Sequence, residues 1–143
     1  MAIEQVREYF RKAGIEERIQ EFEVSSATVE LAAEALRCEP CRIAKSLSFL
    51  VDETPVLVVT AGDVKIDNRK YKEQFGTKAK MLKPDEAPER IGHAVGGVCP
   101  FAVKDGVKVY LDCSLRRFDT ELSIPEMEQY SGFIEWVDVC KNP

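Results

Sequence analysis

The sequence lacks segments that would cross a membrane or direct export. No apolar run approaches the roughly 20 residues that a helix needs to span a bilayer. The charged N-terminal segment, residues 1–11, lacks the apolar stretch of a secretory signal. Linkers, repeats and low-complexity stretches are missing too. We therefore expect a single domain over residues 1–143, in the cytoplasm and without a membrane partner.

Cysteine and histidine are too sparse for a disulfide framework or a metal cluster. The chain has five cysteines, an odd number, and one histidine. Because no export signal is present, reduced thiols are expected. Cys38 and Cys41 form a C-x-x-C motif, but no second pair supplies the remaining ligands of a zinc site. No metal and no cofactor is expected, and a small thiol or metal protein built on this motif is kept as an alternative.

Charge is unevenly distributed along the chain. The 20 basic and 25 acidic side chains give a net charge of −5, which argues against a protein that coats nucleic acid over its whole surface. Between residues 65 and 83, however, seven basic residues accompany two acidic ones. A local phosphate-binding face is one interpretation, and a solvated helix and loop is the other.

Hydrophobic spacing predicts helices inserted among strands. Helices are predicted at residues 2–12, 27–36, 67–75, 84–91 and 125–130, and strands at 19–24, 43–51, 55–61, 107–112 and 133–139. The short turn between the second and third strands predicts an antiparallel hairpin. The continuous apolar run of the third strand predicts burial on both faces. The pattern indicates an α+β fold with a mixed, largely antiparallel sheet.

Lys45 lies within a predicted strand, on the face that carries the larger apolar side chains. Alternation places it with Leu47 and Phe49 and away from Ala44 and Ser46. Burial of an ammonium group without a partner costs several kcal/mol, so two interpretations follow. The side chain either extends to solvent at the edge of the strand, or it lines a cavity and meets an anionic or polar ligand.

A glycine-rich loop at residues 92–100 is a second candidate. Gly96 and Gly97 let the backbone approach a ligand closely, and exposed amides there can hold an anion or a developing oxyanion. Pro100 fixes the exit of the loop. A tight turn between a helix and a strand is the alternative. The spacing matches neither the dinucleotide fingerprint nor the P-loop.

His93 and Cys99 belong to the same loop. His93 can act as a base, donate a hydrogen bond to a substrate, or be structural. A nucleophilic pair of Cys99 with His93 is conceivable. No third group that would orient such a pair is evident in the sequence, which argues against covalent thiol catalysis.

Four segments together resemble the YbaK family, relatives of the editing domain inserted in bacterial prolyl-tRNA synthetase. They are TVELAAEAL at 28–36, IAKSL at 43–47, PVLVV at 55–59 and GHAVGGVCPF at 92–101. Their order and spacing cover roughly residues 25–118. The resemblance implies a barrel-like sheet with flanking helices, and hydrolysis of mischarged aminoacyl-tRNA without a metal.

The resemblance also implies roles for individual residues. Lys45 matches the family's functional lysine, which would hold the terminal phosphate or another substrate oxygen. Gly96 and Gly97 belong to a G-x-x-x-P loop whose amides would hold the aminoacyl carbonyl while water, helped by a ribose hydroxyl, attacks the ester. The implied substrate contacts are His93, Val98, Cys99 and Pro100, and the candidate tRNA contacts in the basic stretch are Lys65, Arg69, Lys70 and Lys72.

One segment departs from the family's pattern. Relatives have a small-residue turn with Gly-Ser and Asn between the positions that match Phe118 and Pro125, whereas residues 119–124 here contain no glycine. The expected function is a free-standing deacylase for the acceptor end of mischarged tRNA. The alternative is a non-catalytic module that binds such tRNA ends or a synthetase. The sequence leaves open the edited amino acid, the tRNA and the oligomeric state.

Overall fold

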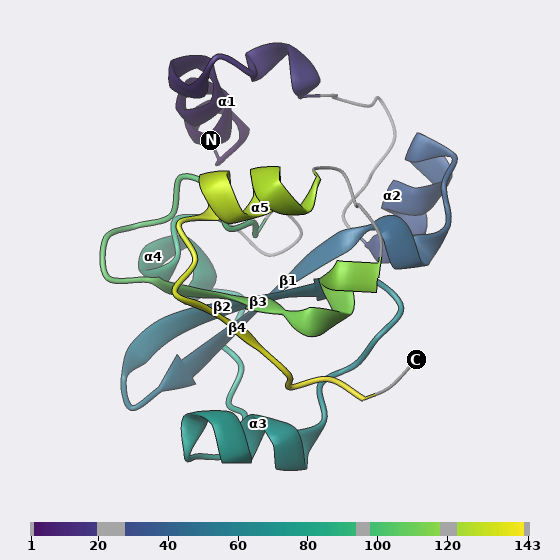
Figure 1. Ribbon diagram of the computed structural model, residues 1–143. Coiled ribbons are helices and arrows are strands. Elements are labelled where there is room, and N and C mark those ends of the chain that lie inside the picture. Colours follow the sequence, from purple (N-terminus) through teal and green to yellow (C-terminus); the bar gives the residue numbers. More distant parts are fainter. Residues whose placement is uncertain (1, 20–27, 94–97, 118–122, 142–143) are drawn as a thin grey trace.

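The computed structural model describes residues 2–19, 28–93, 98–117 and 123–141 (Figure 1). Its helices are α1 (Ala2–Ala13), α2 (Val29–Leu36), α3 (Asn68–Phe75), α4 (Ala87–Arg90) and α5 (Ile124–Ser131). Its strands are β1 (Ala44–Val51), β2 (Thr54–Ala61), β3 (Lys108–Asp112) and β4 (Glu135–Val137). Short 3-10 helices are η1 (Glu16–Arg18), η2 (Pro40–Arg42) and η3 (Cys113–Arg117). None of the helices in these ranges has the length and apolar character required to cross a membrane.

The strands of the described residues form one sheet in the order β1-β2-β3-β4. β1 and β2 pair antiparallel, whereas β2 with β3 and β3 with β4 pair parallel. The α+β class and the mixed sheet with flanking helices are confirmed. Two details are corrected: among the four strands only β1 and β2 pair antiparallel, with one further antiparallel bridge from Phe49 to Met81, and the sheet is open instead of barrel-like. The connections to β3 and β4 carry helices, and connections of that length permit parallel pairing.

Local signals explain the hairpin of β1 and β2. Asp52 and Glu53 have φ angles of 47° and 70°. These left-handed values let a tight turn follow the twist of its two strands. Every residue from Val56 to Ala61 is buried, so the prediction of a strand buried on both faces is confirmed.

Capping residues fix the ends of two predicted helices. The side chain of Thr28 accepts a backbone amide at the start of α2, and that of Asp67 accepts two at the start of α3. Gly76 ends α3 with a φ of 75°, which glycine adopts without steric cost. The predicted helix at 84–91 is present only as α4. The predicted strand at 19–24 lies, apart from its first residue, outside the described ranges.

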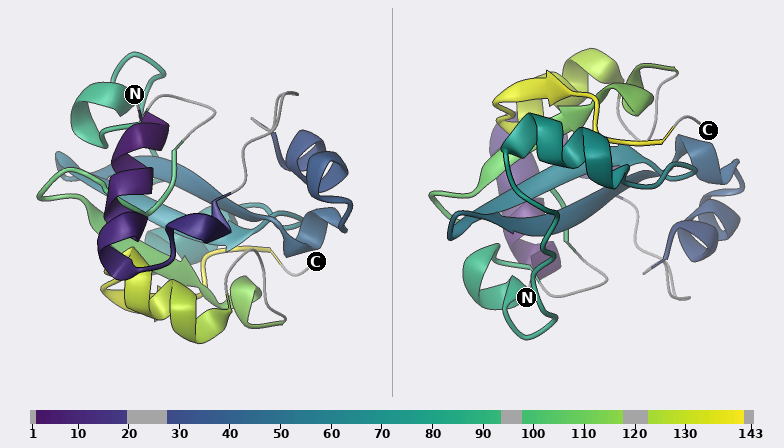
Figure 2. Two further views of the ribbon diagram at one scale, coloured as in Figure 1. Left: turned by 90° about the horizontal axis from the view of Figure 1, so that it is seen from above. Right: turned by 90° about the horizontal axis from the view of Figure 1, so that it is seen from below.

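Helices cover both faces of the sheet (Figure 2). α3 lies on one face, where Tyr71 packs against Phe49 of β1 with ring centroids 4.9 Å apart. α1 and α5 lie on the other face (Figure 1). Side chains alternate along a strand, and Phe49 contacts α3. The odd-numbered residues of β1 therefore lie on the face that α3 covers. The even-numbered residues of β1 therefore face α1 and α5.

Candidate functional site

A cavity of about 200 Å³ lies between the first half of β1 and the end of the glycine-rich loop. Its lining residues are Ala44, Ser46, Val59, Val98, Cys99, Pro100, Phe101 and Met127. None of these residues is charged. Such a wall accepts a small uncharged group, whereas a phosphate or carboxylate would lose its hydration without compensation.

Two elements bring distant residues to this cavity. Ala44 and Ser46 are even-numbered residues of β1, on the face that α5 covers. Met127 comes from α5, which begins with a reciprocal capping box. The hydroxyl of Ser123 accepts the amide of Glu126, and the Glu126 carboxylate accepts the amide of Ser123. The cap fixes where α5 begins and so where Met127 lies over the sheet.

His93 is buried behind the cavity wall, with 1% of its surface exposed. Its Nε2 lies 2.7 Å from the carbonyl oxygen of Phe101. Because a carbonyl only accepts, Nε2 carries the proton and donates it to this bond. Nδ1 is buried and has no hydrogen-bond partner among the described residues. This geometry makes His93 an anchor for the loop end instead of a base that faces the cavity.

Cys99 lines the cavity as a protonated thiol. Its Sγ lies 3.8 Å from Nε2 of His93 and donates to the carbonyl of Phe101 at 3.6 Å. Burial raises the pKa of Cys99 to about 11. The thiolate is the nucleophilic form of cysteine, so this environment argues against a nucleophilic pair with His93.

The residue that follows Phe101 of the cavity wall has a strained backbone. Ala102 has a φ of 54°. For a non-glycine residue the left-handed region costs about 1–2 kcal/mol. Strain of this kind persists only where surrounding contacts hold it, and the bond from His93 to the adjacent Phe101 carbonyl is one such contact.

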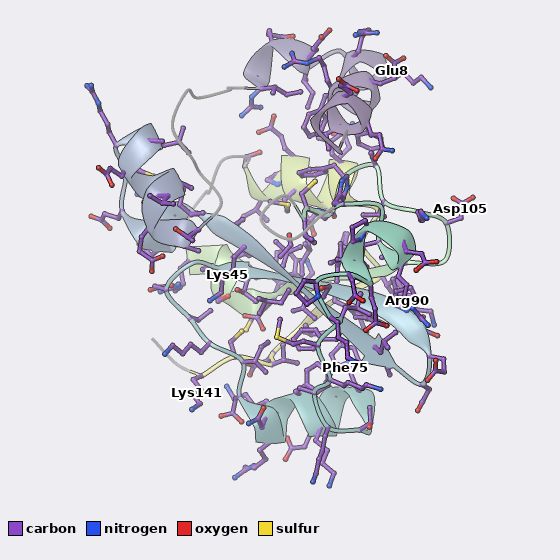
Figure 3. The ribbon with its side chains drawn as sticks, turned by 180° about the vertical axis from the view of Figure 1, so that it is seen from behind. Glu8, Lys45, Phe75, Arg90, Asp105 and Lys141 are labelled. Atoms are coloured by element: carbon purple, nitrogen blue, oxygen red, sulfur yellow. The ribbon has the colours of Figure 1, made fainter. Side chains whose placement is uncertain are left out.

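Lys45 lies on the other face of β1, toward α3. Its Nζ donates to the carbonyl of Val64. Burial lowers the pKa of Lys45, while Cys140 and Asp63 act against that shift. The side chain is half-buried at the edge where β2 ends, and Figure 3 shows it on the same side of the view as Lys141. It therefore neither extends freely into solvent nor lines the cavity.

The structure brings part of the predicted site together. Val98 to Pro100 line one cavity, and His93 supports that wall from behind. The strand itself separates Lys45 from the cavity. Gly96 and Gly97 lie outside the described residues, so their role stays a prediction. Sequence reasoning missed the cavity residues from β1 and α5, because their convergence depends on tertiary packing.

The candidate tRNA contacts lie on α3 and just before it. α3 covers the face of the sheet opposite to α5, which contributes Met127 to the cavity (Figure 2). Lys65, Arg69 and Lys72 are exposed. Lys70 is half-buried, and its Nζ donates to Asp138 at 3.1 Å and to the carbonyl of Cys140 at 2.9 Å. Lys70 therefore ties α3 to the C-terminal segment.

Asp112 is a buried carboxylate that sequence reasoning missed. It lies at the end of β3 and is fully buried. Its carboxylate accepts the backbone amides of Ser114 and Val139, both at 2.9 Å. An aspartate at the last position of an apolar strand and two residues before a serine was the available signal. These bonds connect β3 to the segment that follows β4.

One group of described side chains has the geometry to share a metal ion. Donor atoms of Asp112, Cys113 and Asp138 lie within 4.8 Å of one another. Lys70 already pairs with Asp138, and backbone amides already use the carboxylate of Asp112. The cysteines of the C-x-x-C motif are free thiols outside this group, so the thiol or metal alternative gains no support.

Comparisons of the chain with known proteins point to one family. A family model described as an aminoacyl-tRNA editing domain matches residues 23–138. The "Uncharacterized protein YwhH" of Bacillus subtilis is 45% identical over an alignment of 155 positions that covers 99% of both chains. Because that alignment is longer than the 143 residues of this chain, YwhH contains residues that this chain lacks.

Two proline–tRNA ligases match over a shorter region. The enzyme of Lactiplantibacillus plantarum is 30% identical over 86 residues, which are 59% of this chain and 15% of the ligase. The enzyme of Aquifex aeolicus is 34% identical over 90 residues, which are 62% of this chain and 16% of the ligase. This chain therefore corresponds to a small part of each ligase.

A solved structure shows the same fold. It is described as the "Crystal structure of a putative trans-editing enzyme for prolyl tRNA synthetase". The TM-score is 0.84 at 23% identity, with 99% of this chain and 98% of that chain covered. The open mixed sheet and its flanking helices are thus those of an existing fold.

Proposed function

The chain belongs to the family of aminoacyl-tRNA editing domains, and from this membership we propose that it is a deacylase for mischarged tRNA that acts apart from a synthetase. The near-complete overlap with a structure described as a putative trans-editing enzyme supports this proposal. The resemblance of the four sequence segments to the YbaK family supports it as well.

The observation that carries the proposal is the small uncharged cavity. A volume of about 200 Å³ suits the side chain of a small amino acid and is too small for a nucleotide. The wall combines apolar surface with the hydroxyl of Ser46 and the neutral thiol of Cys99. Because one methylene group changes binding by only about 1–3 kcal/mol, such a pocket distinguishes amino acids mainly by size.

The proposed reaction is hydrolysis of the ester between the amino acid and the terminal ribose. The oxygen of water attacks the carbonyl carbon, and the bond to the ribose oxygen breaks. That oxygen takes up a proton, which leaves a free amino acid and an uncharged tRNA. The amides of Gly96 and Gly97 are proposed to stabilise the developing oxyanion, where a fixed donor contributes about 3–4 kcal/mol. A ribose hydroxyl of the substrate assists the water, and no metal takes part.

Lys45 is proposed to hold the terminal phosphate or another substrate oxygen. Its ammonium bonds to the Val64 carbonyl, so it must exchange this partner for the substrate. Lys45→Met keeps the apolar stem and removes the charge. We expect this variant to fold and to lose most of its turnover, because a charge-assisted bond is lost. Unchanged turnover would remove Lys45 from the site.

The proposal is tested with the purified chain and a panel of tRNAs that carry correct and incorrect small amino acids. Release of the amino acid from at least one mischarged tRNA is expected, with the same rate in the presence of a chelator. If no member of the panel is hydrolysed, the deacylase proposal is wrong.

A non-catalytic binding module is the second candidate. Two observations favour it: residues 119–124 contain no glycine where relatives have a small-residue turn, and YwhH contains residues that this chain lacks. If the chain binds mischarged tRNAs tightly but hydrolyses none of them, the binding module is the correct alternative. A synthetase as its partner is tested by the same binding assay with the synthetase added.

A further inference from the structure

We propose that Phe10 of α1 is a positioning residue whose ring holds Phe101 in place and thereby sets the size of the group that the cavity admits. That this group is an amino-acid side chain rests on the proposed deacylase function. The packing of Phe10 against Phe101 does not depend on that function. α1 precedes residues 23–138, the region that the family model matches.

Aromatic contacts join α1 to the cavity wall. Phe10 is buried, and its ring centroid lies 4.9 Å from that of Phe101 and 6.1 Å from that of Tyr130 in α5. The ring of Tyr9 lies 6.5 Å from Phe101, and its hydroxyl donates to the carbonyl of Tyr130 at 2.6 Å. Buried rings of this size supply much of the contact area where elements meet. Phe10 is therefore the buried centre of the contact between α1 and the cavity wall.

Phe101 is the residue through which this contact reaches the cavity. Phe101 belongs to the cavity lining, and its carbonyl accepts the proton of His93 Nε2. The next residue, Ala102, is held in the left-handed region. The segment is thus fixed through its carbonyl by His93 and through its ring by Phe10. Loss of the ring contact lets the strained turn relax, and the wall moves with it.

A second contact fixes α1 relative to the opposite wall. Arg18 of η1, which follows α1, forms an ion pair with Glu126 of α5. The residue after Glu126 is Met127, which lines the cavity. The N-terminal segment therefore contacts both sides of the cavity, through α1 at Phe101 and through η1 next to Met127.

The first test needs no substrate. Phe10→Ala, Phe10→Leu and the wild-type chain are treated with N-ethylmaleimide at pH 8, and modification of each cysteine is followed by peptide mass spectrometry. We expect Cys99, which lines the cavity, to react about tenfold faster in Phe10→Ala, because local opening exposes groups that packing protects. Cys113 is exposed and serves as the internal reference. Phe10→Leu keeps an apolar side chain and should restore most of the protection.

The second test measures selectivity on mischarged tRNA. We expect the ratio of kcat/KM for a small over a large amino acid to fall about tenfold in Phe10→Ala, which is within the range that pocket size controls. Tyr9→Phe is the matched control, because it keeps the ring near Phe101 and removes only the hydroxyl bond to α5. Its selectivity should equal that of the wild type.

The two tests separate the possible failures. If the wild type hydrolyses no tRNA, the deacylase function fails, and the rate of Cys99 modification still decides whether Phe10 holds the wall. Equal Cys99 modification in all variants overturns the inference, whatever the activity. A folded Phe10→Ala variant with faster Cys99 modification but unchanged selectivity overturns the assigned role in substrate choice.

Discussion

His93 and Cys99 both donate to the carbonyl of Phe101, and this shared acceptor decides what the two residues can do. The bond from His93 is 2.7 Å long and uses Nε2, while the thiol of Cys99 approaches at 3.6 Å. The imidazole is buried, and burial keeps the thiol protonated by raising its pKa. At the scale of single residues, the pair therefore acts as a support for the cavity wall.

A substitution at His93 tests this structural role. We expect His93→Ala to lower the free energy of unfolding by about 2–3 kcal/mol, because it removes the shorter of the two hydrogen bonds to the Phe101 carbonyl and opens a void. His93→Gln can still donate an amide proton and should lose less. Urea denaturation measures both values. If His93→Gln keeps full stability and loses all hydrolysis, His93 acts in catalysis and the anchor interpretation is wrong.

The thiol of Cys99 makes stability depend on alkaline pH. Its ordinary pKa of 9.0 is raised to about 11 by burial. Between these values the unfolded chain loses the proton first, so the folded state loses stability as the pH rises above 9. The free energy of unfolding therefore declines between pH 8 and 11, and we expect Cys99→Ala to remove about 1–2 kcal/mol of this decline. The decline is measured by urea denaturation in a reducing buffer, and equal slopes in both proteins would contradict the assigned environment.

At the scale of elements, local and non-local signals differ in what they predict. The hairpin of β1 and β2 and the helix predicted at residues 67–75 follow from neighbouring residues, and these predictions are confirmed. The parallel pairing of β3 and β4 depends on contacts across helical connections, which hydrophobic spacing does not encode. The same limit applies to the site: Val98 and Cys99 were found from their loop, whereas Met127 was not.

The hairpin turn offers a test at this scale. Glu53 has a φ of 70°, which is unfavourable for a residue with a side chain. We expect Glu53→Gly to raise the free energy of unfolding by about 0.5–1 kcal/mol relative to Glu53→Ala, because glycine adopts this conformation without steric cost. The alanine variant controls for the exposed ion pair with Arg90. Thermal or urea unfolding of the two variants gives the difference. A glycine variant no more stable than the alanine variant would contradict the turn geometry.

At the scale of the whole molecule, the sheet separates two groups of predicted residues. The cavity is lined in part by Met127 of α5. α3, which carries basic residues, covers the other face of the sheet (Figure 2). Lys45 stands at the sheet edge between them, on the α3 face. Neither periodicity nor composition could show this separation, because it depends on which helix covers which face. A tRNA that contacts α3 must therefore pass around this edge to place its acceptor end in the cavity.

The salt dependence of tRNA binding tests the contact with α3. Lys72 is exposed, and we expect Lys72→Gln to weaken binding of uncharged tRNA and to lower the salt slope of the binding constant by about one. Lys70→Gln is the comparison, because Lys70 is already paired with Asp138 and its loss should lower stability more than affinity. Filter binding over a range of salt concentrations gives both slopes. An unchanged slope for Lys72→Gln excludes this residue from the tRNA contact.

The most direct measurement of the central claim is single-turnover hydrolysis of mischarged tRNA by a chain whose cavity is filled. Ala44→Leu places a larger side chain into the lining, and Ala13→Leu makes the same exchange at an exposed position of α1. We predict that Ala44→Leu binds uncharged tRNA as the wild type does but releases the amino acid about ten to a hundred times more slowly, since a pocket that no longer fits the side chain loses about 1–3 kcal/mol of transition-state binding. A folded Ala44→Leu protein that hydrolyses the ester as fast as Ala13→Leu would contradict the assignment of this cavity to the substrate.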